Sequence, residues 1–236
     1  MNMQSGLAEA DAYTGTDNLE AMERADRYNA YLVDLAARYM PRDGRCLDFG
    51  AGIGTFAERV DALGFDVTAL DPEAVHVTAL EALGLNTLAS LDDVLDETFS
   101  GVWSFNVLEH IQDDVAALRD IHRVTAPGGV VVLYLPALEW LWTSMDDKVR
   151  HYRRYTRARL ARKLEAADFR VEHVRYADSL GVVATLLFKV LGSRDGDIDG
   201  EAVALYDRMI FPLSRRLDSA LGRVLGKNVI AVARRV

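Results

Sequence analysis

The stretch from Cys46 to Phe56 limits what this chain can fold into more than any other part of the sequence. It begins as a short apolar strand and runs into three glycines at alternate positions, Gly50, Gly52 and Gly54. A helical pattern of apolar residues follows directly. Glycine lets a backbone turn sharply and approach a bound molecule where a Cβ atom would collide. The sequence therefore predicts a strand, a tight ligand-binding turn and a helix in succession.

A second apolar strand, expected at residues 66–70, ends in Asp71. A carboxylate at the tip of a neighbouring strand is placed to accept hydrogen bonds from both hydroxyls of a ribose. The glycines have the spacing Gly-x-Gly-x-Gly, not the Gly-x-Gly-x-x-Gly of dinucleotide-binding turns, and Asp48 precedes them. A carboxylate at that point suits a ligand with an ammonium and a sulfonium group better than a pyrophosphate. The pattern thus indicates a site for a nucleoside cofactor of this kind.

These two motifs together resemble the first two motifs of the class I S-adenosylmethionine (SAM) methyltransferases. The resemblance covers roughly residues 25–178 and includes the segments 106–111 and 123–129, which match the family's fourth motif and the turn before its fifth strand. It implies an α/β, Rossmann-like, doubly wound sheet of seven strands in the order 3-2-1-4-5-7-6, the last strand antiparallel, with helical additions at both ends. The βαβα alternation of the residues themselves also favours a doubly wound parallel sheet.

Composition narrows the class of protein further. The 236 residues are 50% hydrophobic, which suits one α/β domain with additions. A single cysteine, no signal-peptide pattern and no apolar run of about 20 residues lead us to expect a cytoplasmic protein without a transmembrane segment. A net charge of −9 argues against nucleic acid as a partner. Peripheral membrane contact and a monomeric or homodimeric state both remain open.

We expect three regions along the chain. Residues 1–40 form a lead-in and a lid helix, with the helix at 19–40; residues 41–178 form the SAM-binding core; and residues 179–236 form a helical acceptor-side cap and a closing strand of the same domain. Within the last region we expect an apolar helix at 179–191, an acidic loop at 193–200, one basic-faced helix over 201–225, and the strand at 227–234.

The resemblance implies a set of cofactor-binding residues. Tyr28 would belong to the lid, although packing in the core explains a tyrosine there equally well. The segment from Ser90 would hold the adenine, although Ser90 is also an ordinary N-cap for a helix. The full expected set is Tyr28, Asp48, Gly50, Ala51, Gly52, Asp71, Pro72, Ser90, Leu91, Asp92, Asn106 and Val107.

Two histidines are candidate general bases, because imidazole titrates near neutral pH. His110 follows the fourth strand and His151 lies in a later basic segment; His110 could equally be bonded to backbone at the start of a helix. Some quinone O-methyltransferases bind a divalent metal through a Glu-x-x-Glu-His pattern. Asn106 stands at the first position of that pattern here, which removes one hard oxygen ligand. We therefore predict no metal.

The acceptor-binding residues are expected after the fifth strand, where the loops of an α/β sheet form the ligand crevice. Trp140 and Trp142 suggest an apolar wall, with a packed surface helix as the alternative. Residues 148–163 contain eight Lys or Arg and no Asp or Glu. They resemble a Gly-His-x-Arg-Arg-Tyr-Thr signature of a bacterial methyltransferase subgroup, with Arg150 in place of the glycine. A solvated helix face is the default reading, but arginine pairs also bind anions. The expected acceptor residues are Trp140, Trp142, Arg150, Tyr152, Arg153 and Arg154.

The sequence thus predicts a SAM-dependent methyltransferase that acts on a small, anionic and partly apolar molecule, such as a natural product, an isoprenoid or a quinone- or lipid-type metabolite. Two other classes stay open. One is a SAM-binding protein without catalysis, in which the basic segment recruits a partner. The other is a nicotinamide-dependent oxidoreductase, which the glycine spacing and Asp48 disfavour.

Overall fold

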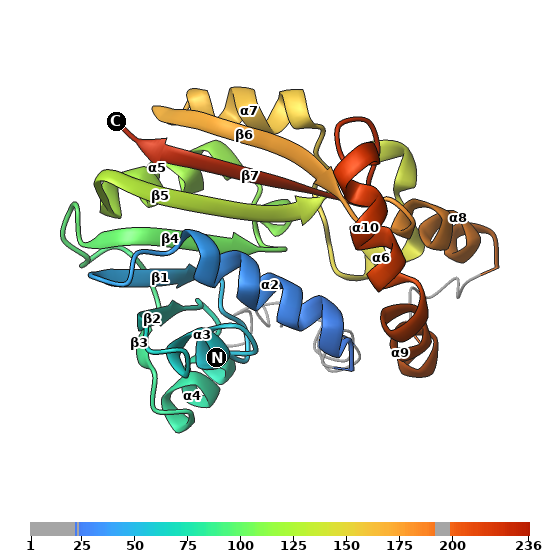
Figure 1. Ribbon diagram of the computed structural model, residues 1–236. Coiled ribbons are helices and arrows are strands. Elements are labelled where there is room, and N and C mark those ends of the chain that lie inside the picture. The colour runs from blue at the N-terminus through green and yellow to red at the C-terminus, as the bar shows by residue number, and fades with distance from the viewer. Residues whose placement is uncertain (1–21, 23, 192–198) are drawn as a thin grey trace, which may run out of the picture.

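The computed structural model describes residues 22, 24–191 and 199–236 (Figure 1). The predicted lead-in, the first residues of the predicted lid helix and most of the predicted acidic loop lie outside the described residues. No helix in the described part of the chain combines the length and the apolar composition needed to cross a bilayer.

The core is a seven-stranded sheet with the order β3-β2-β1-β4-β5-β7-β6. Neighbouring strands run parallel except that β7 is antiparallel to both β5 and β6. This is the predicted order and the predicted antiparallel strand. The strands are β1 (Arg45–Phe49), β2 (Asp66–Leu70), β3 (Asn86–Leu88), β4 (Phe99–Phe105), β5 (Thr125–Pro136), β6 (Phe169–Ala177) and β7 (Asn228–Arg235).

The two faces of the sheet are buried under different helices. Side chains alternate along a strand, so Val131 and Leu133 of β5 join one apolar cluster while Val132 and Tyr134 join the other. Helices α5 and α7 cover the first face, and α2, α3, α4 and α10 cover the second (Figure 1). The helices are α2 (Asp26–Tyr39), α3 (Ala57–Asp61), α4 (Ala74–Ala82), α5 (Asp114–Val124), α6 (Ser144–Lys148), α7 (Arg157–Glu165), α8 (Gly181–Leu191), α9 (Gly200–Met209) and α10 (Phe211–Leu221), with short 3-10 turns η1 (Leu108–His110) and η2 (Glu139–Leu141).

The single helix predicted over residues 201–225 is wrong. Two helices, α9 and α10, stand there and meet at Ile210, and Pro212 occupies the first turn of α10. Proline has no N–H to donate to the preceding turn, and its ring clashes with the carbonyl four residues earlier. The chain therefore ends one helix before the proline and starts another.

The break between α9 and α10 allows α9 to pack against the start of α2. The first N–H groups of a helix have no partner within it. In α2, the N–H groups of Arg27 and Tyr28 donate to the two carboxylate oxygens of Asp207 in α9, at 2.9 and 2.8 Å. The Asp207 side chain is buried, and its negative charge lies at the positive end of the α2 dipole. This carboxylate ties α9 to the helix that was predicted to be the lid.

Replacing Asp207 by alanine should leave these two N–H groups unpaired. We expect Asp207→Ala to lower the free energy of unfolding by about 1–2 kcal/mol, the usual cost of losing a helix N-cap. Glu201→Ala, which removes an exposed carboxylate from the same helix, should change it by less than about 0.5 kcal/mol. Urea denaturation monitored by circular dichroism measures both values. Equal destabilisation by the two variants would show that Asp207 does not anchor α2.

Candidate active site

The three glycines after β1 all adopt the left-handed backbone conformation, with φ values of +83° at Gly50, +56° at Gly52 and +93° at Gly54. Two of them make room for the protein itself. A Cβ atom on Gly50 would lie 2.5 Å from the methyl groups of Val107, and one on Gly54 would lie 2.7 Å from Leu83. A Cβ atom on Gly52 would meet nothing within 4 Å. The turn is therefore open at Gly52, where a ligand can approach the backbone.

Asp71 lies beside this turn, as predicted. Its carboxylate accepts hydrogen bonds from the N–H of Gly52 at 2.8 Å, from the N–H of Glu73 at 3.0 Å, and from His76 Nδ1 at 2.9 Å. A carboxylate offers about four acceptor positions, so the contacts that fix Asp71 still leave one for a ribose hydroxyl. Pro72, the next residue, is exposed. Sequence reasoning missed His76; its position in the first turn of the helix after Asp71 was the only signal.

Asp48 carries an unusual buried carboxyl group. Its side chain is 2% exposed, and its Oδ2 has no hydrogen-bond partner among the described residues. Burial, helped by the neighbouring Asp71 carboxylate, raises the pKa of the Asp48 carboxyl to about 8, against a lowering effect of Trp103. Buried polar atoms almost always have a partner. An unpaired carboxyl beside a glycine turn fits a ligand that brings a cationic amino group.

The segment predicted to hold the adenine follows β3. Ser90 and Asp92 are exposed and Leu91 is buried, and Ser90 Oγ accepts the N–H of Asp92 at 3.3 Å. No helix begins here in the described chain, so the alternative reading of Ser90 as a helix N-cap is not what the structure shows. The N–H of Asp71 donates to the carbonyl of Leu88 at 3.1 Å, which places this turn next to the ribose position. The adenine role stays a prediction.

Tyr28 reaches from α2 to the end of β4. Its hydroxyl accepts a hydrogen bond from Asn106 Nδ2 at 3.2 Å, and its ring packs edge-on against Tyr134 and Phe211. The two readings of Tyr28, lid residue and core residue, are thus both compatible with its position. Asn106 itself has a left-handed φ of +55°, and the next residue, Val107, abuts Gly50. The end of β4 is therefore packed against the glycine turn.

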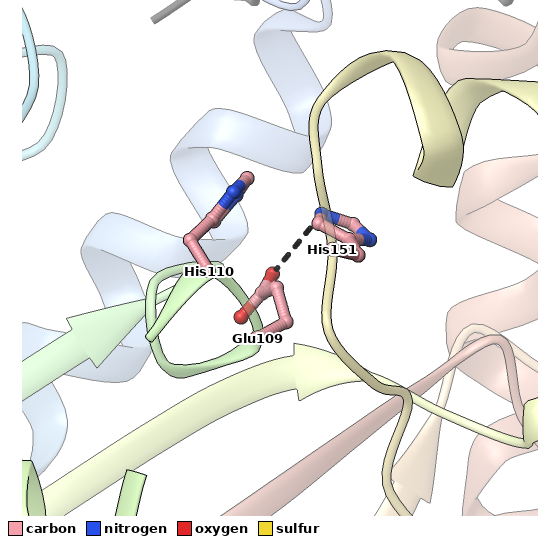
Figure 2. Close-up of side chains that lie close together, drawn as sticks. All are labelled: Glu109, His110 and His151. Carbon is pink, nitrogen blue, oxygen red and sulfur yellow. Dashed lines mark ion pairs between the residues drawn. The ribbon is translucent and has the colours of Figure 1, made fainter. Parts of the chain in front are cut away.

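A carboxylate and two imidazoles lie close together at the segment that follows Val107 (Figure 2). Glu109 and His110 come from η1, and His151 comes from the loop after α6. His151 Nε2 lies 3.9 Å from Glu109 Oε1, and the centroids of the two imidazole rings are 4.6 Å apart. One nitrogen or oxygen from each residue lies within 4.8 Å of the others. The structure thus brings both predicted bases to one place, together with Glu109.

His151 is oriented by a carboxylate that the sequence did not single out. Its Nδ1 lies 2.8 Å from Asp146 Oδ1. Arg154 binds the same carboxylate through Nε and Nη2, both at 2.8 Å. Burial opposes ionisation of Asp146, but the bonds from His151 and Arg154 overcome it and hold its pKa well below the usual range. An ionised Asp146 can only accept a hydrogen bond, so Nδ1 of His151 is the donor to it, and Nε2 is the nitrogen that faces Glu109.

The pKa values of Glu109 and His110, the other two members of the cluster, are shifted in opposite directions. Burial raises the pKa of Glu109 to about 7, and neither of its oxygens has a hydrogen-bond partner among the described residues. Burial, together with the electrostatic effect of the neighbouring His151, lowers the pKa of His110 to about 4. His110 is therefore neutral at pH 7 and a weak proton acceptor. Of the two predicted bases, His151 is the one for which a contact with a carboxylate is observed.

The predicted acceptor residues divide into two groups. Two of the three aromatic ones lie beside the cluster: the Trp142 ring is 6.4 Å from that of His151, and the N–H of Tyr152 donates to the carbonyl of Glu109 at 2.8 Å. Both Tyr152 and Trp140 are about half exposed, at 53% and 50%. Trp140 lies on η2, and no contact with the cluster is found for it within the described chain.

The arginines serve the protein's own packing. Arg154 is 2% exposed and paired with Asp146, while Arg153 donates to the carbonyls of Ile111 and Gln112 and pairs with Asp114 at 3.0 Å. Neither guanidinium is left open toward an acceptor. Arg150 is exposed and has a left-handed φ of +56°, the conformation that the glycine of the resembled signature would adopt most easily.

Comparisons with known proteins agree with this geometry. A family model described as a methyltransferase domain matches residues 21–174. The ubiquinone biosynthesis O-methyltransferase of Xanthomonas axonopodis pv. citri (strain 306) is 29% identical over 163 residues, which cover 59% of this chain and 68% of that protein.

Solved structures share the fold at low identity. A SAM-dependent methyltransferase from Thermotoga maritima superposes with a TM-score of 0.62 at 16% identity, covering 94% of this chain and 96% of that one. Phosphoethanolamine N-methyltransferase 2 of Haemonchus contortus, in complex with phosphomonomethylethanolamine and S-adenosylhomocysteine (SAH), gives a TM-score of 0.64 at 16% identity over 95% of this chain and 58% of that one.

The family model and the sheet order identify a class I SAM-dependent methyltransferase, and the open glycine turn with Asp71 beside it is compatible with that class. With the family model matched over most of its length, the chain belongs to the methyltransferase-domain family, and its cofactor is SAM.

We predict that Asp48 lowers the stability of the folded protein at high pH and strengthens cofactor binding. The folded protein keeps this carboxyl protonated up to a pH of about 8, whereas the unfolded chain ionises it near a pH of about 4. Since the unfolded state holds fewer protons between these values, the free energy of unfolding falls as pH rises through the window. We expect Asp48→Asn to remove this slope, and to be more stable than the wild type by about 1–3 kcal/mol at a pH of about 8.5, yet to bind SAH more weakly.

Urea denaturation between pH 5 and 8.5 and calorimetric titration with SAH measure the two effects. A variant that is less stable than the wild type throughout, or that binds SAH equally well, would contradict this role of Asp48.

Proposed function

We propose that this methyltransferase methylates a hydroxyl group on a small, partly apolar acceptor, and that His151 is the general base. The observation that carries the proposal is the Asp146–His151 pair at 2.8 Å, with Nε2 of His151 directed toward Glu109 beside the end of β4. This is the arrangement of an imidazole that is held in one tautomer and supported in its protonated form by a carboxylate.

The chemistry of methyl transfer determines what SAM supplies and what the side chains of the protein must do. Bound SAM supplies a methyl group that its sulfonium already activates. The chain's own residues have to hold the acceptor in line with that methyl group and to remove the proton that a hydroxyl loses. His151 Nε2 would accept this proton, and the ionised Asp146 would stabilise the imidazolium that results. The Glu109 carboxylate, once ionised, would add to that stabilisation at 3.9 Å.

Two arguments favour a hydroxyl acceptor. A base poised beside the methyl-transfer site is useful for a nucleophile that carries a proton to be lost, as a phenol does. The relative from Xanthomonas is named an O-methyltransferase of ubiquinone biosynthesis, which supports a phenol- or quinone-type acceptor. A natural product or an isoprenoid remains within the same chemical description.

The binding roles in this proposal follow the geometry. Asp71 would hold the ribose, the turn around Gly52 with Asp48 the methionine part, and the Ser90–Asp92 turn the adenine. Trp142 and Tyr152 would form the apolar acceptor wall beside His151. Arg153 and Arg154 do not enter the proposal, because Asp114 and Asp146 already neutralise them. The main argument for a negatively charged acceptor was these arginines, and their pairing removes it.

Removing the base should slow methyl transfer without loosening the cofactor. We expect His151→Asn to lower kcat by about 100- to 10,000-fold, the usual contribution of a general base, while the affinity for SAH stays within about twofold of the wild type. His110→Asn, its neighbour with the lowered pKa, should cost less than about tenfold. The assay measures SAH formation from SAM with 3,4-dihydroxybenzoate and a panel of related phenols as acceptors.

Three outcomes would contradict the proposal. Wild-type turnover by His151→Asn would remove His151 as the base. No SAH formation with any acceptor of the panel would favour a SAM-binding protein without catalysis. Activity that is lost to a chelator and restored by Zn²⁺ would make Glu109, His110 and His151 a metal site, since two imidazoles and a carboxylate are a known zinc ligand set.

A further inference from the structure

A groove of about 590 Å³ opens between α2, the edge strand β6 and α10, and it shares no residue with the glycine turn or the His151 cluster. Its lining is dominated by cations from four separate parts of the chain. The five arginines that line it are Arg38, Arg157, Arg175, Arg215 and Arg223.

These arginines are not balanced locally. The only carboxylate in the lining, Asp218, accepts the N–H groups of Asp178 and Ser179 at 2.8 and 2.9 Å. His173 is also part of the lining; burial and the nearby Arg175 lower its pKa, so it adds no charge at neutral pH. Within the described ranges, no carboxylate forms an ion pair with any of the five guanidiniums, whereas Arg153 and Arg154 are paired. Such a concentration of unpaired cations is unexpected in a chain of net charge −9.

Aromatic and backbone groups hold three of these arginines in place. Arg175 Nη2 lies 3.3 Å from the Tyr31 hydroxyl, and the Arg215 guanidinium stacks 3.9 Å above the Tyr31 ring. Arg157 Nε donates to the carbonyl of Val174 at 3.0 Å, and its Nη1 donates to the carbonyl of Arg223. A guanidinium has five N–H donors, so each keeps donors for a ligand after making these contacts. The side chains are therefore ordered before any ligand arrives, which lowers the entropy cost of binding.

We propose that this groove binds a compact polyanion that carries two or more phosphate groups. Guanidinium forks match phosphate oxygens in a planar, two-pronged geometry. A single carboxylate would neutralise only one of the five cations, whereas a di- or triphosphate engages several at once. The groove volume lies within the usual range for small-ligand sites. The phosphates could belong to a soluble metabolite or to a lipid headgroup, and the proposal does not depend on the acceptor or the base proposed above.

The test compares two double variants of equal charge change in the full-length protein. Arg215→Gln with Arg223→Gln removes two cations of the groove. Arg208→Gln with Arg216→Gln removes two exposed cations of α9 and α10 that do not line it. Calorimetry with tripolyphosphate at low salt gives the affinity for a soluble polyanion, and co-sedimentation with vesicles containing phosphatidylinositol 4,5-bisphosphate gives the affinity for a headgroup with several phosphates. Thermal unfolding without ligand confirms that the variants fold.

We expect the groove variant to lose at least about tenfold in affinity for one of the probes, and the control variant to stay within about twofold of the wild type. Loss with tripolyphosphate assigns a soluble ligand, and loss with vesicles alone assigns a headgroup. No binding of either probe by the wild type would overturn the proposal. Equal loss in the two variants would also overturn it, because the attraction would then be a general effect of surface charge. SAH binding, measured in parallel, should be unchanged in both variants.

Discussion

The hydrogen bond between the N–H of Gly52 and the carboxylate of Asp71 is the contact on which the proposed cofactor site depends. It joins the turn after β1 to the tip of β2, and Gly52 makes it from a left-handed backbone conformation that glycine adopts most easily. Gly50 lets Val107 approach the same turn from the end of β4. One short segment thereby fixes how three strand ends face each other. Asp48, Asp71 and Asn106 lie at those three ends.

The buried carboxylates of the site differ mainly in what lies next to them. Asp146 has Arg154 and His151 as partners and stays ionised. Oδ2 of Asp48 and both carboxyl oxygens of Glu109 have no hydrogen-bond partner in the part of the chain that is described, and burial raises the pKa of both groups. In the function proposed above, Asp146 would position His151, whereas the unpaired oxygens of the other two would face an arriving ligand or proton. The same contrast separates the paired Arg153 and Arg154 from the unpaired arginines of the groove.

The sequence predicts those features of the structure that depend on residues close together in the chain. The glycine turn and Asp71 follow from apolar runs and glycine spacing, and the strand order follows from family resemblance. The break at Ile210 was missed because the basic face continues across Pro212, and a proline in the first turn of a new helix looks the same in sequence as one inside a long helix. Distant pairings could not be predicted. Arg153 and Arg154 form ion pairs with Asp114 and Asp146, and the groove is lined by residues that lie as far apart in the sequence as Arg38 and Arg223.

The measurement that tests the account most directly is calorimetric titration of the wild type, Asp71→Asn and the exposed control Asp93→Asn with SAH and with NAD. The account predicts micromolar binding of SAH by the wild type and the control, and at least about tenfold weaker binding by Asp71→Asn, with no binding of NAD. Binding of NAD in place of SAH, or equal SAH affinity in all three proteins, would contradict the assignment of this glycine turn and its carboxylate as the cofactor site.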